Sequence, residues 1–377
     1  MTNPSLLPPA KNIPVDRLAA IFDNTTNSYK FYWFLAILEC VKENQSYIIP
    51  TDHLVARMIG NVWYPINYFR LSFGKQDRLD PIVLAIASEL NLAVDLSKSE
   101  IVDAVAGYMR NSGTLARAIA SLKAYVPYRF QRPFFESQLR GVADWKINRS
   151  IREMSDLAFY DQTAPCIYRY TQTAGGDEGV EVHPRWLAYL QMNLPIIRGY
   201  CLWNLVNYLQ RNNPNVPNIP GKIFAPERRN LGASRRFWQA AITALGQVCC
   251  IYSGATLQAE SFSLDHFIPW SYVAHDLMWN IIPTRVDINS AKNDRLPNLS
   301  TYLDPFAQLQ YDAIQAVAKN RKANLLEDYV LLCGTQSINE LQAMPVSEFK
   351  QILRDTIAPQ IQIAKNMGFV VDWSYAV

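Results

Sequence analysis

The feature that most constrains this chain is the stretch LDHFIPWSYVAHDLMWNIIPTRVDINSAKNDRLP, residues 264–297, in which short apolar runs alternate with isolated polar residues. Asp265 and His266 close the first apolar run, and a proline follows soon after, so we predict a strand that ends or twists there. The segment WNIIPTR predicts a short return strand, and DINSAKND predicts a helix. Asn289 and Lys292 lie three apart and therefore share one helix face, which can look back at the Asp-His pair.

These residue types suit the hydrolysis of a phosphodiester bond. That reaction needs a base that activates water and a hard cation that neutralises charge on the phosphate and the leaving oxygen. Asp265 and His266 supply an oxygen ligand and a base on neighbouring residues. The later pair, His275 and Asp276, falls between the two expected strands, and we interpret it as fixing that connection.

The pattern formed by Asp265-His266, Asn280 and Asn289-x-x-Lys292 resembles that of the HNH nucleases. Their ββα-metal core is a two-stranded hairpin followed by a helix that holds one divalent cation. The intervals are similar to those in the HNH domain of RNA-guided CRISPR effector nucleases, where the motif also takes the form His-Asn-Asn. The resemblance implies that His266 is the general base and that Asn280 braces the loop holding it. It also implies that Asp265 and Asn289 are metal ligands and that Lys292 contacts a phosphate.

Two departures from the family pattern refine these expectations. The third motif position is Asn289 rather than His, and because an amide oxygen is a hard ligand we expect Mg²⁺ or Mn²⁺ as the cofactor. The CxxC zinc pairs of many relatives are missing, so surrounding helices must support the core. The segments NSYKFYWFLAILE, IYSG and DHFIPWSYVAHDLMWN also look like larger bacterial HNH proteins of restriction and antiviral defence, which implies a role in such a system.

The rest of the chain is mostly of helical periodicity, with Ser97 or Ser99 suited to a helix N-cap. The segment CIYRYTQTAGGDEGVEVHPRW predicts a hairpin, because a Gly-Gly pair lies between β-prone flanks. We expect a helical domain over 1–160, a mixed segment and linker over 161–230, and an HNH nuclease domain with C-terminal helices over 231–377. The predicted fold class is α+β: a mostly helical chain with a ββα-metal core in its C-terminal half.

Basic residues concentrate in two places, although the net charge is only +3. The first is the segment 110–152, where only Glu136 and Asp144 are acidic. Its basic residues are Arg110, Arg117, Lys123, Arg129, Arg132, Arg140, Lys146, Arg149 and Arg152. The second is a group of four arginines, Arg228, Arg229, Arg235 and Arg236, which precedes the Asp-His pair. Aromatic residues interleave with the first set, as in nucleic-acid-binding surfaces, so we predict phosphate contacts from Arg129, Arg132, Lys146 and the four arginines. The alternative is a solvated helix face whose aromatic residues belong to the core.

We read the N-terminus as lacking a signal peptide, because no basic region followed by an apolar stretch is present. The longest apolar run, FYWFLAILECV, is too short to span a bilayer, and the six cysteines include no CxxC pair. We therefore expect a cytoplasmic protein without membrane contact. The resemblance to the HNH nucleases implies that it acts as a DNA endonuclease. Two alternatives stay open: cleavage of RNA, and a non-catalytic subunit that binds nucleic acid or recruits a nuclease. The oligomeric state and the need for other defence proteins are not set by the sequence.

Overall fold

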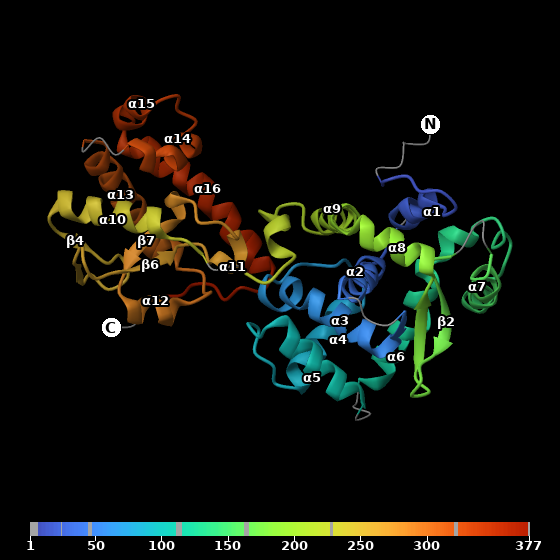
Figure 1. Ribbon diagram of the computed structural model, residues 1–377. Coiled ribbons are helices and arrows are strands. Elements are labelled where there is room, and N and C mark those ends of the chain that lie inside the picture. Colours follow the sequence, from blue (N-terminus) through green and yellow to red (C-terminus); the bar gives the residue numbers. More distant parts are fainter. Residues whose placement is uncertain are drawn as a thin grey trace. The chain divides into compact units, whose positions relative to one another are not determined.

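The computed structural model divides the chain into two compact units (Figure 1). The first consists of Met1–Pro214 with Lys222–Ala225, and the second of Asn215–Gly221 with Pro226–Val377. The structure describes residues 7–23, 25–43, 47–110, 115–161, 166–226, 229–319 and 323–375. No helix within these ranges combines the length and the apolar composition needed to cross a bilayer. The three-part division expected from the sequence stays a prediction.

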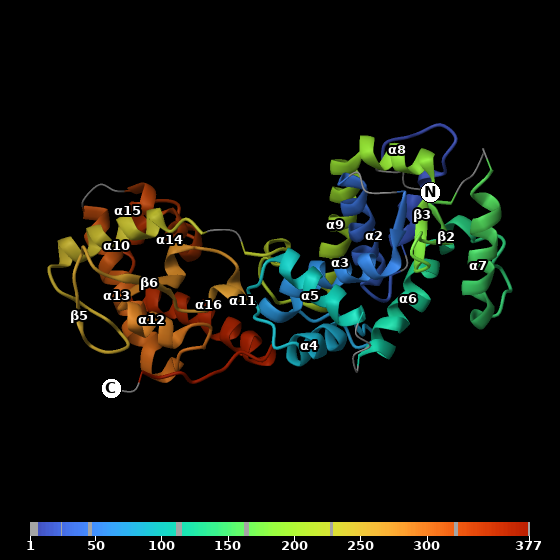
Figure 2. The same ribbon diagram turned by 60° about the horizontal axis from the view of Figure 1, so that its bottom comes forward.

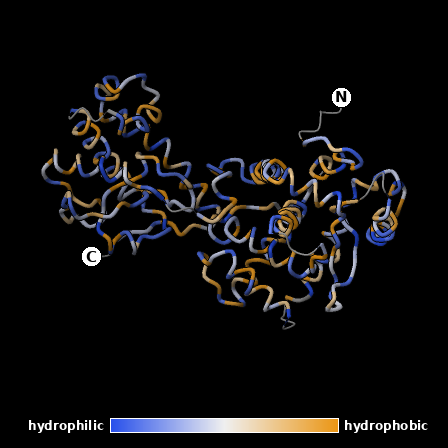
Figure 3. Tube along the Cα trace, in the orientation of Figure 1, coloured by the Kyte–Doolittle hydropathy of each residue, from blue (hydrophilic) through white to orange (hydrophobic). Residues whose placement is uncertain are grey.

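The first unit is built mainly of helices. They are α1 (Val15–Ala19), η1 (Ala20–Phe22), α2 (Tyr29–Lys42), α3 (Thr51–Trp63), η2 (Tyr64–Tyr68), α4 (Leu79–Glu89), α5 (Lys98–Arg110), α6 (Ala116–Phe130), η3 (Arg132–Phe135), α7 (Asp144–Ala158), α8 (Pro184–Met192) and α9 (Leu194–Asn212). Helix α2 is buried along most of its length and packs against α3 and α9. Figure 3 shows mostly hydrophobic colouring along α2, which contains the longest apolar run of the sequence.

One antiparallel sheet accompanies these helices, with strand order β1-β3-β2. The predicted hairpin is confirmed as β2 (Tyr168–Gln172) and β3 (Glu178–Val182), which pair in register from Tyr168–Val182 to Gln172–Glu178. Strand β1 (Ile48–Pro50) adds to the other edge of β3, and three residues are too few to show a strand pattern in the sequence. In Figure 2 the hairpin runs beside α6 and α7, and α7 contacts β2 directly.

The second unit surrounds two small hairpins with helices. Its elements are α10 (Gly232–Leu245), β4 (Val248–Cys249), β5 (Thr256–Leu257), β6 (Ser263–His266), α11 (Trp270–Val273), η5 (Met278–Asn280), β7 (Ile281–Thr284), α12 (Val286–Lys292), α13 (Leu299–Lys319), η6 (Ala323–Leu325), α14 (Glu327–Cys333), α15 (Ile338–Ala343) and α16 (Val346–Asn366). A further short helix, η4 (Ile219–Lys222), lies at the junction of the two units in the sequence. Small sheets within a mostly helical chain make the fold α+β, as predicted.

The core of the second unit lies around β6 and β7. Phe267, Ile281, Ile282 and Ile288 are fully buried there, and each such side chain contributes about 1.5–3 kcal/mol by leaving water. The flanking helices also satisfy strand atoms: the indole Nε1 of Trp238 on α10 donates to the Ile281 carbonyl at 3.1 Å. The missing zinc pairs are therefore replaced by helix packing around the hairpin.

Candidate functional site

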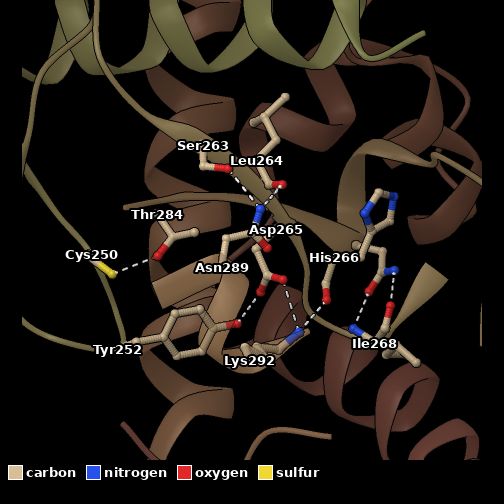
Figure 4. Close-up of polar contacts among 11 residues, drawn as sticks. Cys250, Tyr252, Ser263, Leu264, Asp265, His266, Ile268, Thr284, Asn289 and Lys292 are labelled. Atoms are coloured by element: carbon tan, nitrogen blue, oxygen red, sulfur yellow. Dashed lines mark hydrogen bonds and ion pairs between the residues drawn. The ribbon is translucent and has the colours of Figure 1, made fainter. Parts of the chain in front are cut away.

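The predicted strand, return strand and helix form a continuous ββα unit. Strands β6 and β7 are antiparallel, with Asp265 opposite Ile282 and His266 opposite Ile281. Helix α12 packs against β6. The five motif residues lie on these elements or directly beside them, and Figure 4 shows Asp265, His266, Asn289 and Lys292 grouped around the end of β6.

Asp265 is buried and accepts two hydrogen bonds from side chains. Its Oδ2 accepts from the hydroxyl of Tyr252 at 2.7 Å, and its Oδ1 accepts from Nζ of Lys292 at 3.0 Å. Burial, reinforced by the charge of Asp265, raises the pKa of Tyr252 well above its usual value, so this hydroxyl remains a donor. Two donors thus fix the carboxylate in one orientation, and sequence reasoning did not anticipate Tyr252.

Lys292 is wholly buried, which corrects its expected role as a phosphate contact. Its exposed fraction is 0%, and its ammonium donates to Asp265 and, at 2.7 Å, to the backbone carbonyl of His266 (Figure 4). A buried ammonium must be paired because its desolvation is costly, and these two oxygens supply the pairing. In this structure Lys292 therefore ties α12 to the end of β6 and does not face a substrate.

Asn289 is half-buried, and its amide is held in one orientation. Its Nδ2 donates to Oγ of Ser263 at 2.8 Å and to the carbonyl of Leu264 at 3.1 Å. Because a carbonyl can only accept, the amide nitrogen must face Leu264 and the amide oxygen must face away. That oxygen receives no hydrogen bond from any described residue, so it is available as a hard ligand.

His266 is 6% exposed and pairs with the carboxylate of Asp276, which the sequence analysis interpreted only as fixing the connection between the strands. Its Nε2 lies 2.8 Å from Oδ1 of Asp276. A carboxylate accepts, so Nε2 carries the hydrogen of this contact, and in the neutral imidazole Nδ1 has the lone pair. No described residue hydrogen-bonds to Nδ1. The interpretation of the His275-Asp276 pair was incomplete: His275 accepts from the Leu277 amide at 3.4 Å, whereas Asp276 reaches His266. The connection between the strands is irregular, so no residue spacing could have revealed this contact.

Asn280 is wholly buried and braces the segment after His266. Its Oδ1 accepts from the amide of Ile268 at 2.8 Å, and its Nδ2 donates to the carbonyl of the same residue at 2.9 Å. Its own carbonyl accepts from the Phe267 amide at 2.8 Å. This geometry is what a loop-bracing residue requires, because both polar groups of a buried peptide are satisfied by one side chain.

The donor set fits a hard divalent cation. Asp265 offers a carboxylate whose two oxygens carry more lone pairs than its two donors use, and Asn289 offers its free amide oxygen. Among the described residues no group of three His, Cys, Asp or Glu side chains could hold a metal. Mg²⁺ usually retains several waters and takes further oxygens from a substrate, so one carboxylate and one amide can suffice as protein ligands.

The four arginines that precede the hairpin differ in the contacts that they make within the protein. Arg235 donates to the Phe262 carbonyl at 3.2 Å, and the guanidinium of Arg229 lies 5.3 Å from the centre of the Trp270 ring. Arg236 is exposed on α10. Arg228 lies outside the described residues.

The basic segment of the first unit is only partly free to bind a phosphate. Arg129 makes a two-pronged ion pair with Asp144, at 2.8 and 3.1 Å, and donates to Asn148 at 2.8 Å. These contacts hold Arg129 in the fold, and its predicted phosphate contact stays a prediction. Arg132 and Lys146 are exposed, and the ammonium of Lys146 lies 4.9 Å from the centre of the neighbouring Trp145 ring.

Comparison with known proteins identifies this part of the chain. The sequence model of the HNH endonuclease family matches residues 250–298, which include β5, β6, β7 and α12. No curated protein and no solved structure matched the chain at a significant level. The matched range contains every motif residue described above, and an HNH domain implies binding of nucleic acid and nuclease activity. Residues 250–298 of this chain therefore match the HNH endonuclease family.

Proposed function

We propose that this protein is a metal-dependent endonuclease that hydrolyses phosphodiester bonds in DNA. The observation that carries the proposal is the arrangement of Asp265, His266 and Asn289: two oxygen ligands and an oriented imidazole on one hairpin and one helix. The similarity of several segments to bacterial HNH proteins of restriction and antiviral defence supports a cytoplasmic role in such a system. Arg132, Lys146 and the arginines before the hairpin are the proposed contacts to the DNA backbone.

In the proposed mechanism His266 accepts the proton of the attacking water at Nδ1. Its Nε2 keeps its hydrogen and donates it to Asp276, whose negative charge stabilises the imidazolium that forms. Asn280 holds the peptide of Ile268 and so fixes the chain directly after the base. The protein therefore presents one nitrogen, in one tautomer, to the reacting water.

Asp265 and Asn289 would hold Mg²⁺ or Mn²⁺. When bound, the ion would neutralise charge on the phosphate and on the leaving oxygen. Tyr252 and Lys292 hold Asp265: their hydrogen bonds keep the carboxylate from rotating, and Lys292 also donates to the carbonyl of His266. Ser263 does the same for Asn289.

The test is cleavage of plasmid DNA and of RNA by the purified chain with Mg²⁺, with Mn²⁺ and with EDTA. We expect nicking or linearisation of the plasmid with either metal and none in EDTA. His266→Ala should slow cleavage by roughly 10²- to 10⁴-fold, the usual contribution of a positioned base. His275→Ala is the matched control, since it removes a nearby histidine that is not assigned to the site; His275 accepts from the Leu277 amide and lies against the Trp279 ring.

Asp265→Asn distinguishes the loss of a metal ligand from the loss of the general base. It keeps the size of the side chain but weakens metal binding, so a higher metal concentration should restore part of the rate, whereas no concentration restores His266→Ala. If the protein cleaved RNA but not DNA, the proposed substrate would be RNA instead of DNA. Full activity in EDTA, or an active His266→Ala variant, would contradict the assigned site.

A further inference from the structure

The first unit contains a pocket whose lining is strongly basic. It has a volume of about 510 Å³, within the range of small-molecule sites. Its walls come from the start of α2, from the residue before α4, from α6 and from η3. The charged residues that line it are Lys30, Arg78, Arg129, Arg132 and Asp144.

The only carboxylate in this lining is already neutralised. Both oxygens of Asp144 accept from Arg129, and these hydrogen bonds lower the pKa of Asp144. Within the described part of the chain, Lys30, Arg78 and Arg132 make no ion pair. Lys30 donates only to the carbonyl of Ile21, at 3.1 Å. Three cations therefore line the pocket without a described ion-pair partner, although Asp23 acts on Lys30 and Asp144 on Arg132 at longer range.

The surroundings of Lys30 show that this charge is costly in the free protein. Burial, and secondly the neighbouring Arg132, lower the pKa of Lys30 to about 8. A dehydrated ammonium beside a guanidinium is stabilised by an anion that contacts both. Two guanidinium groups add the planar, paired donors that suit phosphate oxygens.

An aromatic ring completes the site. Tyr125 lies on α6 in the same lining and is 57% exposed. An exposed tyrosine face beside phosphate-binding cations offers a platform on which a nucleobase can stack. A pocket of this volume is too small for a duplex, but it accommodates a single nucleotide.

We propose that this pocket binds the phosphate monoester of a nucleotide, with Lys30, Arg78 and Arg132 on the phosphate and Tyr125 against the base. The nucleotide can be free or can be the 5′ end of a strand, since both present the same group. The proposal concerns a site outside the HNH motif and does not depend on the nuclease mechanism.

The experiment is isothermal titration calorimetry of the full chain with AMP, adenosine and inorganic phosphate. We expect AMP to bind and adenosine not to bind. Arg78→Gln and Arg132→Gln should each weaken AMP binding roughly tenfold or more, because each removes a charge-assisted hydrogen bond. Arg140→Gln is the matched control: it removes the same charge from an exposed position in the same segment, outside the pocket.

Tyr125→Leu distinguishes the contribution of the nucleobase to binding from that of the phosphate. It should weaken AMP binding while leaving inorganic phosphate unaffected, and equal loss for both ligands would refute the stacking role. Titration with 5′-phosphorylated and 5′-hydroxyl oligonucleotides then identifies the source: preference for the phosphorylated strand over AMP indicates a strand end, and the reverse indicates a free nucleotide. No binding of AMP, or unchanged binding by the Arg78→Gln/Arg132→Gln double variant, would overturn the proposal.

Discussion

Asp276 is the residue whose single contact most affects the proposed chemistry. By accepting from Nε2 of His266 it decides which imidazole nitrogen is free. In Asp276→Asn the amide can rotate and donate to Nε2 instead, which moves the hydrogen to Nδ1 and removes the base. We expect cleavage to slow by about 10²-fold or more, as for a mis-set tautomer in a catalytic triad. The measurement is single-turnover cleavage of a DNA substrate.

A purely structural role for Asp276 would give a different result. It would lower the melting temperature of the variant without changing the imidazole tautomer. Nitrogen-15 NMR of labelled histidine reports the tautomer directly. A slow variant whose His266 still carries its hydrogen on Nε2 would show that Asp276 acts in another way.

At the scale of elements, the hairpin β6–β7 depends on Asn280 for its irregular connection. Asn280→Ala leaves both the amide and the carbonyl of Ile268 buried without their partner. We expect the free energy of unfolding of the second unit to fall by about 2–4 kcal/mol, the usual cost of two such groups. Thermal melting checks this value.

Asn366→Ala is the matched control for that change. Asn366 is exposed at the end of α16 and accepts one hydrogen bond from Gln362, so its loss should shift the melting temperature very little. Equal melting temperatures for Asn280→Ala and wild type would show that the connection is held by other contacts.

The ββα elements could be predicted because each has a local cause. Alternating short apolar runs predicted β6 and β7, three-residue spacing predicted α12, and Ser97 does accept from the Glu100 amide, at 3.4 Å, before α5. The support around the hairpin could not be predicted. Gln310 on α13 donates to the Ile281 carbonyl at 2.9 Å, and Asp328 on α14 accepts from the Met278 amide at 2.7 Å. These contacts join residues distant in sequence, and no local pattern encodes them.

The candidate site also has features that could be predicted from the sequence and features that could not. Spacing indicated that Asp265 and Asn289 would both lie near the end of one strand. It could not indicate that Lys292 is buried, because a lysine on an exposed or a buried helix face gives the same sequence pattern. Nor could it show that Tyr252 donates to Asp265, since that tyrosine lies before the hairpin in an irregular segment.

For the whole molecule, both units carry basic residues that are proposed to contact nucleic acid. If Lys146 in the first unit and Arg236 in the second each neutralise one phosphate, each Gln substitution should reduce the slope of log affinity against log salt by about 0.9. The double variant should then lose about twice that amount. A filter-binding titration of DNA at several salt concentrations measures the slope.

Arg129→Gln is the comparison variant for this titration. Its guanidinium is held by Asp144 and Asn148, so the change should lower the melting temperature and leave the slope as it is. A slope that responds to Arg236 alone would assign binding to the second unit. A slope unchanged in both single variants would mean that these basic residues are only solvated.

The ion pair between Lys292 and Asp265 also couples the binding of metal to the binding of substrate. One ammonium already cancels one carboxylate, so a divalent ion held there leaves excess positive charge even when the carboxylate of Asp276 is counted. A phosphodiester supplies the missing negative charge. On the proposed assignment, metal and substrate therefore bind cooperatively. Thermodynamic reciprocity makes the factor by which DNA tightens the metal equal to the factor by which the metal tightens DNA.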